Sequence, residues 1–315
     1  MKYEQIEKLL QYHEQESKVF IPNEIFKDLK ASGIKNSPHI AFAYSYYYLI
    51  CWLYRYTKYG LINDIDNKKI KEILGYTSIT KGLDYLIKKN GLLDDLGYTI
   101  TSKDFPISWT YEDYFLEFDL LSGMDGDMQK LIKQQYSRKY TVKFPPKAFH
   151  RCEESEDDNY LDGTFYEVDN THLIPFEVFL FCMSNKELGC TGFYLYCFIK
   201  RMNDYHSGGW DVSIENMVLD TGIAENTLIR YLDQLRKYKV IEGIHNQEYF
   251  CLALDSNERK ANTYIANDSD IFTYKPQFYE KMKVMSSHDY YKMKEEEFEN
   301  LFGSGIDISV EELPY

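Results

Sequence analysis

Hydrogen-bonding side chains are concentrated in one short stretch of this 315-residue chain, TGIAENTLIRYLDQLRKYKVI at Thr221–Ile241. Within it, Leu228, Leu232 and Leu235 lie at positions i, i+4 and i+7, which predicts a helix with one buried face. The rest of that helix carries amide, hydroxyl and cationic groups, which hydrogen-bond to base edges and phosphates. The candidates are Asn226, Thr227, Arg230, Arg236 and Lys237. We expect Asn226, Thr227 and Arg230 to read DNA bases, and Lys237 to bind phosphate.

A second stretch of the same kind lies earlier, at Thr77–Asn90, and both stretches are locally basic. The earlier one contains three Lys and one Asp, and Ala224–Lys239 contains four Lys or Arg and two Asp or Glu. The whole chain has a formal net charge of −14, but salt screens charges beyond about 10 Å. Local charge therefore decides whether phosphates bind. The alternative is that both stretches are ordinary solvated helix faces that do not contact DNA. The candidates here are Thr80, Lys81, Lys88 and Lys89.

Basic and acidic residues separate sharply in the middle of the chain. Met128–Arg151 contains seven Lys or Arg and no Asp or Glu, and Glu153–Asp169 contains eight Asp or Glu and no Lys or Arg. The basic run could follow a phosphate backbone, with Lys139 and Lys143 as DNA contacts, or form a charged surface helix. The acidic run could be a flexible linker, or could fold back and screen the basic run.

Three blocks of sequence recur in the same order, at separations of 153, 146 and 149 residues. Such variable separations are what loop insertions produce between two copies of one fold. The chain is therefore expected to contain two related domains. The matching blocks are FIPNEIF (Phe20–Phe26) with LIPFEVF (Leu173–Phe179), YYLICWLYRYTKY (Tyr47–Tyr59) with FYLYCFIKRMNDY (Phe193–Tyr205), and LDYLIKK (Leu83–Lys89) with LDQLRKY (Leu232–Tyr238).

Each copy predicts the same series of elements: a long apolar helix, a strand, a helix, a turn, a second helix and a β-hairpin. The long helices are expected at about Pro38–Tyr59 and Thr191–Tyr205. Asp66 and Ser213 are placed to cap the short helices that follow them. The predicted fold class is α+β, mainly α.

The sequence also predicts the buried face of the second helix in the first copy and the positions of strands in both copies. In the first copy, Ile79, Leu83 and Leu86 should form the buried face of the second helix. The first strands are expected at INDI (residues 62–65) and WDV (residues 210–212), and the hairpins should close at GYTIT (residues 97–101) and EYFCLAL (residues 248–254).

The turn and helix of the second copy resemble the winged-helix domains of bacterial plasmid and phage replication initiators and related regulators. The residues that carry the resemblance are Thr221, Gly222, Ile223, Thr227, Leu228, Leu232, Leu235 and Ile241. Two such domains in a chain of this length resemble theta-type plasmid initiators in particular. The resemblance covers about Pro38–Ser102 and Leu173–Ala253. It departs in the first copy, where GYTSITKG lacks Thr-Gly and is shorter through the turn.

The resemblance implies two winged-helix domains that bind double-stranded DNA, in a replication initiator or transcriptional regulator of a plasmid or phage. The expected divisions are a first domain with an N-terminal helix at 1–110, a basic and then acidic linker at 111–170, a second domain at 171–256 and an acidic tail at 257–315. The N-terminal segment Lys2–His13 would be a packing helix or a homodimer contact, and the tail could dock on a protein partner or on the body of the chain.

Other classes of function lack sequence support. The six cysteines form no CxxC pair, and no metal or cofactor is expected. No phosphate-binding Walker sequence or other catalytic motif is present, so we expect no enzyme activity. No secretion signal and no run of 18 apolar residues occurs, which predicts a soluble, cytoplasmic protein with no membrane partner. The alternative function is that of an acidic, tandem winged-helix subunit that binds proteins, as in chromosome-condensing complexes.

Overall fold

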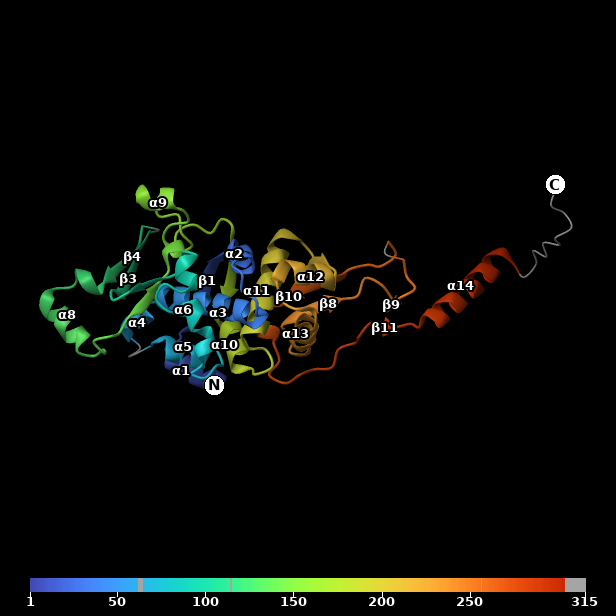
Figure 1. The fold of residues 1–315 in the computed structure, drawn as a ribbon, viewed down its shortest axis with the longest axis horizontal. Coiled ribbons are helices and arrows are strands. Elements are labelled where there is room, and N and C mark those ends of the chain that lie inside the picture. The colour runs from blue at the N-terminus through green and yellow to red at the C-terminus, as the bar shows by residue number, and fades with distance from the viewer. Residues whose placement is uncertain (62–64, 114, 256, 304–315) are drawn as a thin grey trace.

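The computed structural model describes residues 1–61, 65–113, 115–255 and 257–303 (Figure 1). As predicted, the fold is α+β, with long helices and small sheets of two or three strands. The two expected long helices are present as α3 (Ser37–Arg55) and α11 (Gly189–Tyr205), and they pack against each other. This helix pair forms the middle of the molecule.

The two sequence repeats meet strand to strand. β1 (Lys18–Pro22) pairs antiparallel with β6 (Thr171–Pro175), and Phe20 lies opposite Leu173. Phe20 and Leu173 are also equivalent positions of the two repeats. An antiparallel pair in which a position faces its own counterpart is what a twofold axis between two copies produces. The two repeats are therefore arranged about a local pseudo-twofold axis that passes between Phe20 and Leu173.

Aromatic rings fill the interface between the repeats. The rings of Trp52 in α3 and Phe176, at the start of α10 (Phe176–Ser184), stack with centroids 4.0 Å apart. Phe26 in α2 (Ile25–Ala31) packs edge-on against Phe198 of α11 at 4.9 Å. Such stacked and edge-on pairs stabilise by about 0.5–1.5 kcal/mol each beyond their burial. The two repeats therefore share one aromatic core, to which both contribute rings.

A buried histidine lies within this interface. His172 of β6 is 1% exposed, and its Nδ1 donates to Oδ1 of Asn23 at 2.8 Å. The hydroxyl of Tyr44 in α3 donates to His172 Nε2 at 2.6 Å, so the neutral imidazole has both ring nitrogens satisfied. Burial, together with the positive charge of Arg201, lowers the pKa of His172 to about 3. A charged His172 is therefore incompatible with the folded interface near neutral pH.

The second repeat contains the predicted series of elements as far as its second helix. After α11 come β7 (Trp210–Val212), α12 (Ile214–Thr221) and α13 (Glu225–Lys237). The Ser213 hydroxyl accepts from the backbone N–H of Asn216, which confirms the predicted cap. The turn between α12 and α13 begins at Gly222, whose φ of 70° is strained for residues with a side chain.

The return strand of the second hairpin differs from its predicted position. β8 (Ile241–Ile244) pairs with β10 (Asn262–Ala266), and β10 also pairs with β7 to give the sheet order β7-β10-β8. The expected strand at residues 248–254 contributes only β9 (Tyr249–Phe250), which pairs with β11 (Lys283–Val284). The loop between β8 and β10 is therefore much longer than expected, and the sheet extends beyond residue 256.

The first repeat departs further from its predicted series. Asp66 caps α5 (Asn67–Ile73) as expected, by accepting from the N–H groups of Lys68 and Lys69. The second helix is reduced to a 3₁₀ turn at Lys81–Leu83 followed by α6 (Asp84–Ile87). Leu83 and Leu86 are buried as predicted, whereas Ile79 is 81% exposed because the helix begins after it.

The strands of the first repeat also pair differently. The apolar residues Leu92 and Leu93 lie in the one-turn helix α7 (Leu92–Asp95), so no hairpin strand forms there. β2 (Ile100–Ser102) lies within the expected GYTIT region but pairs with β5 (Val142–Phe144), more than 40 residues later. The expected strand INDI falls mostly on residues 62–64, which lie outside the described residues.

Residues 111–170, expected to be a linker, contain regular structure that packs on the first repeat. β3 (Pro106–Glu112) and β4 (Phe115–Leu120) form a hairpin. The basic run then begins in the exposed helix α8 (Gly126–Lys133) and continues into β5 of the first repeat. The acidic run includes the short helix α9 (Glu153–Asp157). Part of the basic run is therefore built into the first repeat, where β5 pairs with β2.

The N-terminal helix packs on the body of the molecule, whereas the helix near the C-terminus projects from it. At the N-terminus, α1 (Tyr3–Leu10) buries Ile6 and Leu10 and packs on α10, so this segment packs within its own chain. The short helix α4 (Lys58–Leu61) follows α3 and contacts β3. At the other end, α14 (Ser287–Phe302) projects from the body (Figure 1). The tail beyond residue 303 lies outside the described residues.

Protonation of His172 should destabilise the fold in acid. Its pKa is lowered in the folded state, so the unfolded chain binds one more proton between about pH 6.5 and pH 3, and stability falls as pH falls through that window. The expected slope is about 1.4 kcal/mol per pH unit. His172→Gln cannot titrate, and urea unfolding at several pH values between 7 and 4 should show a shallower slope. His288→Gln, on exposed α14, is the control; equal slopes in the wild type and His172→Gln would contradict the assignment.

Candidate nucleic-acid interface

The N-terminal half of α13 presents an exposed polar face. Leu228, Leu232 and Leu235 are buried, as predicted, and they hold the helix against the body of the second repeat. Asn226 and Arg230 are exposed and Thr227 is half-buried. The Arg230 guanidinium lies 4.9 Å from the centroid of the Tyr231 ring, and stacking of this kind orients an arginine without using its hydrogen-bond donors. These three predicted residues are therefore brought together at the start of one helix.

The other two predicted residues of α13 are engaged within the chain. Arg236 donates to the backbone oxygen of Gly243 at 3.0 Å, and its guanidinium lies 4.0 Å from the centroid of the Tyr279 ring. Lys237 Nζ forms an ion pair with Asp233 Oδ2 at 2.6 Å. Both cations are half-buried. Both predicted cations therefore have partners within the chain in this structure.

A segment of the tail lies along the C-terminal half of α13. We call residues 273–285 the strap. The backbone N–H of Thr273 donates to Tyr238 O at 3.0 Å, and that of Gln277 donates to Lys237 O at 2.7 Å. The Tyr279 hydroxyl then donates to Asp233 Oδ1 at 2.6 Å. The strap thus covers the C-terminal half of α13 and leaves the N-terminal half accessible.

Asp233 is the main side-chain anchor of the strap. Besides Tyr279 and Lys237, it binds Lys281 Nζ at 3.3 Å. Burial raises the pKa of Asp233, but the hydrogen bonds from Lys237, Tyr279 and Lys281 outweigh burial and lower it to about 2. The carboxylate is therefore ionised at neutral pH and binds cations from both the helix and the strap. A groove of about 530 Å³ remains between the strap and the exposed part of α13, with Asn226 and Arg230 in its wall.

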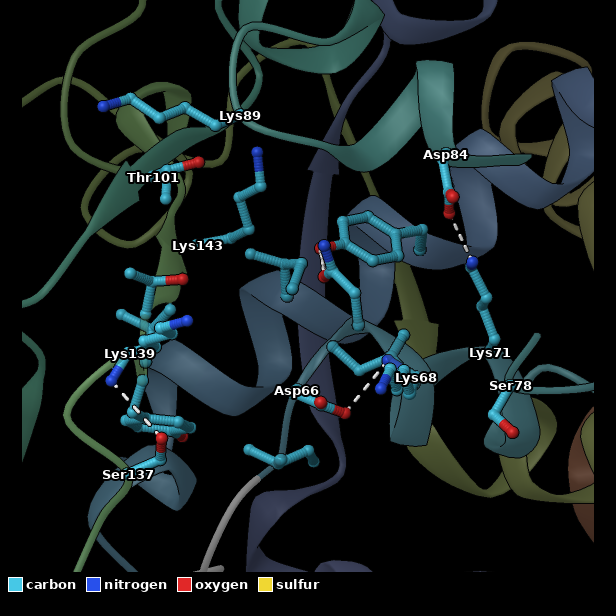
Figure 2. Close-up of a pocket in the computed structure, with 18 of the residues that line it drawn as sticks. Asp66, Lys68, Lys71, Ser78, Asp84, Lys89, Thr101, Ser137, Lys139 and Lys143 are labelled. Carbon is cyan, nitrogen blue, oxygen red and sulfur yellow. Dashed lines mark hydrogen bonds and ion pairs between the residues drawn. The ribbon is translucent and has the colours of Figure 1, made fainter. Parts of the chain in front are cut away.

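The first repeat contains a larger, lysine-lined cavity of about 800 Å³ (Figure 2). We call it the basic cleft. Its walls come from α5, from the turn and short helix that follow, and from the segment leading into β5. Tyr46, Ile50 and Val142 contribute buried aromatic and apolar surface to its lining. Six lysines and two aspartates also line it: Lys68, Lys71, Lys81, Lys89, Lys139, Lys143, Asp66 and Asp84.

Two of these lysines hold the walls of the cleft together. Lys71 of α5 is buried and pairs with Asp84 of α6. Lys143 of β5 is buried and pairs with Asp94 of α7 at 2.5 Å; it also donates to Lys88 O at 3.2 Å. Burial lowers the pKa of Lys143, and Asp94 opposes that change. Lys143 was predicted to contact DNA, but its ammonium group is engaged in this buried pair.

The other predicted residues of the first half of the chain lie at or beside the cleft. Lys81, Lys89 and Lys139 are exposed and line it, although they come from separate segments. Lys88 is exposed at the end of α6. The hydroxyl groups of Thr80 and Thr77 lie 2.8 Å apart, while the Thr80 carbonyl accepts from Lys71 at 2.7 Å. With Lys143, the structure thus brings four of the predicted lysines to one concavity.

Sequence reasoning missed some cations because it misplaced the second hairpin. The loop from β8 to β10 carries Arg259 and Lys260, both exposed, immediately before β10. The predicted hairpin closed at residues 248–254 and therefore did not include Arg259 and Lys260. The signal that could have found β10 is the sequence NTYIA, a β-branched and aromatic run that follows a polar loop. Lys68 is a further cleft residue that was not among the predicted site residues.

Two other features that bear on function are a metal site and a membrane-spanning helix. In the described ranges, no group of three or more His, Cys, Asp or Glu side chains is arranged to hold a metal ion. The helices in those ranges likewise include none with the length and apolar character needed to span a bilayer.

Loss of the Asp233 carboxylate should release the strap. Asp233→Asn removes the charge that binds Lys237 and Lys281 and weakens the acceptor for Tyr279, so the N–H groups of Thr273 and Gln277 should exchange with solvent about tenfold faster at neutral pH. Hydrogen–deuterium exchange read by mass spectrometry measures this. Asp220→Asn, on exposed α12, is the control. Unchanged protection of residues 273–285 in Asp233→Asn would show that the strap does not depend on this anchor.

Comparison with known proteins adds no relative from which a role could be transferred. No protein-family model, no curated protein and no solved structure matches the chain. The function must therefore be argued from the geometry of α13, the strap and the basic cleft.

Proposed function

We propose that this protein binds double-stranded DNA in a sequence-specific manner, through α13 of the second repeat. The proposal includes two finer points: that the two repeats are winged-helix domains, and that the protein is a replication initiator or transcriptional regulator of a plasmid or phage. The observation that carries the proposal is the exposed start of α13, where Asn226, Thr227 and Arg230 lie opposite a buried leucine face.

The order of elements around α13 supports a winged-helix domain. α11, β7, α12, α13 and β8 follow one another, and β10, which comes after β9, lies between β7 and β8 in the sheet. In helix-turn-helix proteins the second helix enters the major groove and its N-terminal residues contact base edges. A 13-residue helix is about 20 Å long, and the major groove is about 12 Å wide and accepts one helix. The strap leaves free the half of α13 that such binding uses.

The chemistry of the exposed residues suits base recognition. An arginine can donate two parallel hydrogen bonds to guanine, and an asparagine can bond in the same bidentate way to adenine. Arg230 and Asn226 are one helical turn apart on the accessible half of α13. Lys239, just beyond the helix, and Lys260, before β10, are exposed and could bind phosphates on either side. The proposed duplex site is therefore locally basic although the chain is acidic.

A second candidate function is protein binding, as in an acidic tandem winged-helix subunit of a chromosome-condensing complex. The observation that favours it is α14, which carries Tyr291 and Leu301 exposed among acidic residues and projects from the body (Figure 1). A gel shift on random duplex DNA separates the two functions. Absence of a shift even at about 50 mM salt would favour protein binding, because non-specific DNA binding is strongest at low salt.

Removal of Arg230 should reduce sequence preference. A preferred duplex is first selected from a random library with the wild-type protein, and binding to it and to a scrambled duplex is then measured by fluorescence anisotropy. Arg230→Ala should lower the ratio of the two affinities by about tenfold or more, because a bidentate contact discriminates bases by about 1–3 kcal/mol.

The matched control for this experiment is Arg138→Ala, which removes the same side chain from an exposed position before β5. It should leave the ratio of affinities unchanged. An Arg230→Ala protein that keeps the wild-type preference would overturn the assignment of α13 as the base-reading helix.

A further inference from the structure

The basic cleft of the first repeat is unlike the polar face of α13. The second helix of the first repeat is a 3₁₀ turn and the four-residue helix α6, whereas α13 has 13 residues. A four-residue helix is about 6 Å long and is too short to follow a major groove. The same region instead forms one wall of a concave cavity. The two repeats therefore differ at this place: the second presents a convex helix and the first a cleft.

The cations of the cleft fall into two classes. Lys71 and Lys143 are buried and paired with Asp84 and Asp94, so their charges are balanced and they join the walls. The other lysines lie at the accessible edges of the cleft, and the structure gives them no ion-pair partner among the described residues. These four are Lys68, Lys81, Lys89 and Lys139.

These four lysines outnumber Asp66, the lining carboxylate that caps α5, so the cleft has an excess of positive charge above its apolar floor and attracts anions. Low-dielectric walls concentrate the resulting positive potential inside a cleft. The four unpaired lysines come from α5, the 3₁₀ turn, the end of α6 and the segment before β5, so they surround the space from several sides. A single monovalent anion would balance only a fraction of this charge. An anion with several adjacent negative charges fits the site better.

The lining also offers groups suited to the rest of a nucleotide. Hydroxyl groups of Ser78, Thr101 and Ser137 lie in the wall and can donate to phosphate or sugar oxygens (Figure 2). Ile79, exposed at the edge, and the Tyr140 ring provide apolar surface that a base can contact. A volume of about 800 Å³ lies within the range of ordinary small-molecule sites, about 300–1,000 Å³.

We infer that the basic cleft is a binding site for nucleotides with consecutive phosphates, separate from the duplex site on α13. The phosphates bind between Lys68, Lys81, Lys89 and Lys139, and the base or sugar contacts Ile79 and Tyr140. The ligand comes either from a single nucleic-acid strand or from a free nucleoside triphosphate, which share this chemistry. The inference goes beyond the proposed function, because it holds whether or not α13 reads duplex DNA.

The test compares two triple variants of the full chain. Lys81→Ala/Lys89→Ala/Lys139→Ala removes three cleft cations and leaves the structural lysines Lys71 and Lys143 in place. The control, Lys275→Ala/Lys283→Ala/Lys292→Ala, makes the same change in charge at exposed positions of the tail. Circular dichroism and thermal unfolding confirm that both variants fold. Binding of inorganic tripolyphosphate, ATP and a fluorescent single-stranded oligonucleotide is measured at about 50 mM salt.

The wild type and the control should bind tripolyphosphate and at least one of the two nucleotide probes, and the cleft variant should bind them about tenfold or more weakly. ATP binding with one-to-one saturation identifies a free nucleotide as the source. Preference for the oligonucleotide, with an affinity that falls steeply with salt, identifies a strand.

Absence of binding by the wild type, or equal loss in the cleft and control variants, would overturn the inference. Arg230→Ala is measured in parallel with the same probes. It should bind tripolyphosphate as the wild type does, so failure of the cleft site and failure of duplex recognition by α13 give different results.

Discussion

The antiparallel pairing of β1 with β6 is the interaction on which the arrangement of the two repeats depends. Phe20 faces Leu173, its own counterpart, so the strands align the repeats about a local twofold axis. α3 and α11 then pack against each other, and neutral His172 is enclosed beside them. Two strands of five residues would be weak alone, because a two-stranded sheet is marginally stable in water. The aromatic interface supplies the burial that the strands lack.

The high tyrosine content of the chain is explained in part by this interface. The chain contains 30 tyrosines. In the structure, the buried hydroxyl of Tyr48 donates to Ile174 O at 3.0 Å, and that of Tyr56 donates to Lys18 O at 2.9 Å. A tyrosine in such a place contributes a large apolar ring and also satisfies a backbone carbonyl that burial would otherwise leave unpaired. Phenylalanine could provide only the first of these contributions.

Ion pairs decide which cations of this acidic protein remain available for a ligand. In the first repeat, Asp84 and Asp94 engage Lys71 and Lys143, and the cleft is left with its edge lysines. In the second repeat, Asp233 engages Lys237 and Lys281, and α13 is left with Arg230. The net charge of −14 is consequently a poor guide to local binding.

The sequence by itself determined the local features: the repeat, the long helices α3 and α11, the caps at Asp66 and Ser213, and the buried leucines of α13. The helices, the caps and the leucine face follow from periodicity and capping, which act over a few residues, and the repeat follows from the similarity of the two segments. Only the tertiary structure decided the pairing of β2 with β5, the place of β10, the exposure of Ile79, the engagement of Arg236 and Lys143, and the contact of Asp233 with the strap. Lys143 meets Asp94 49 residues away, and Asp233 meets Tyr279 46 residues away. Contacts at such separations leave no local pattern, so a lysine that binds an aspartate and one that is free for a phosphate look the same in the sequence.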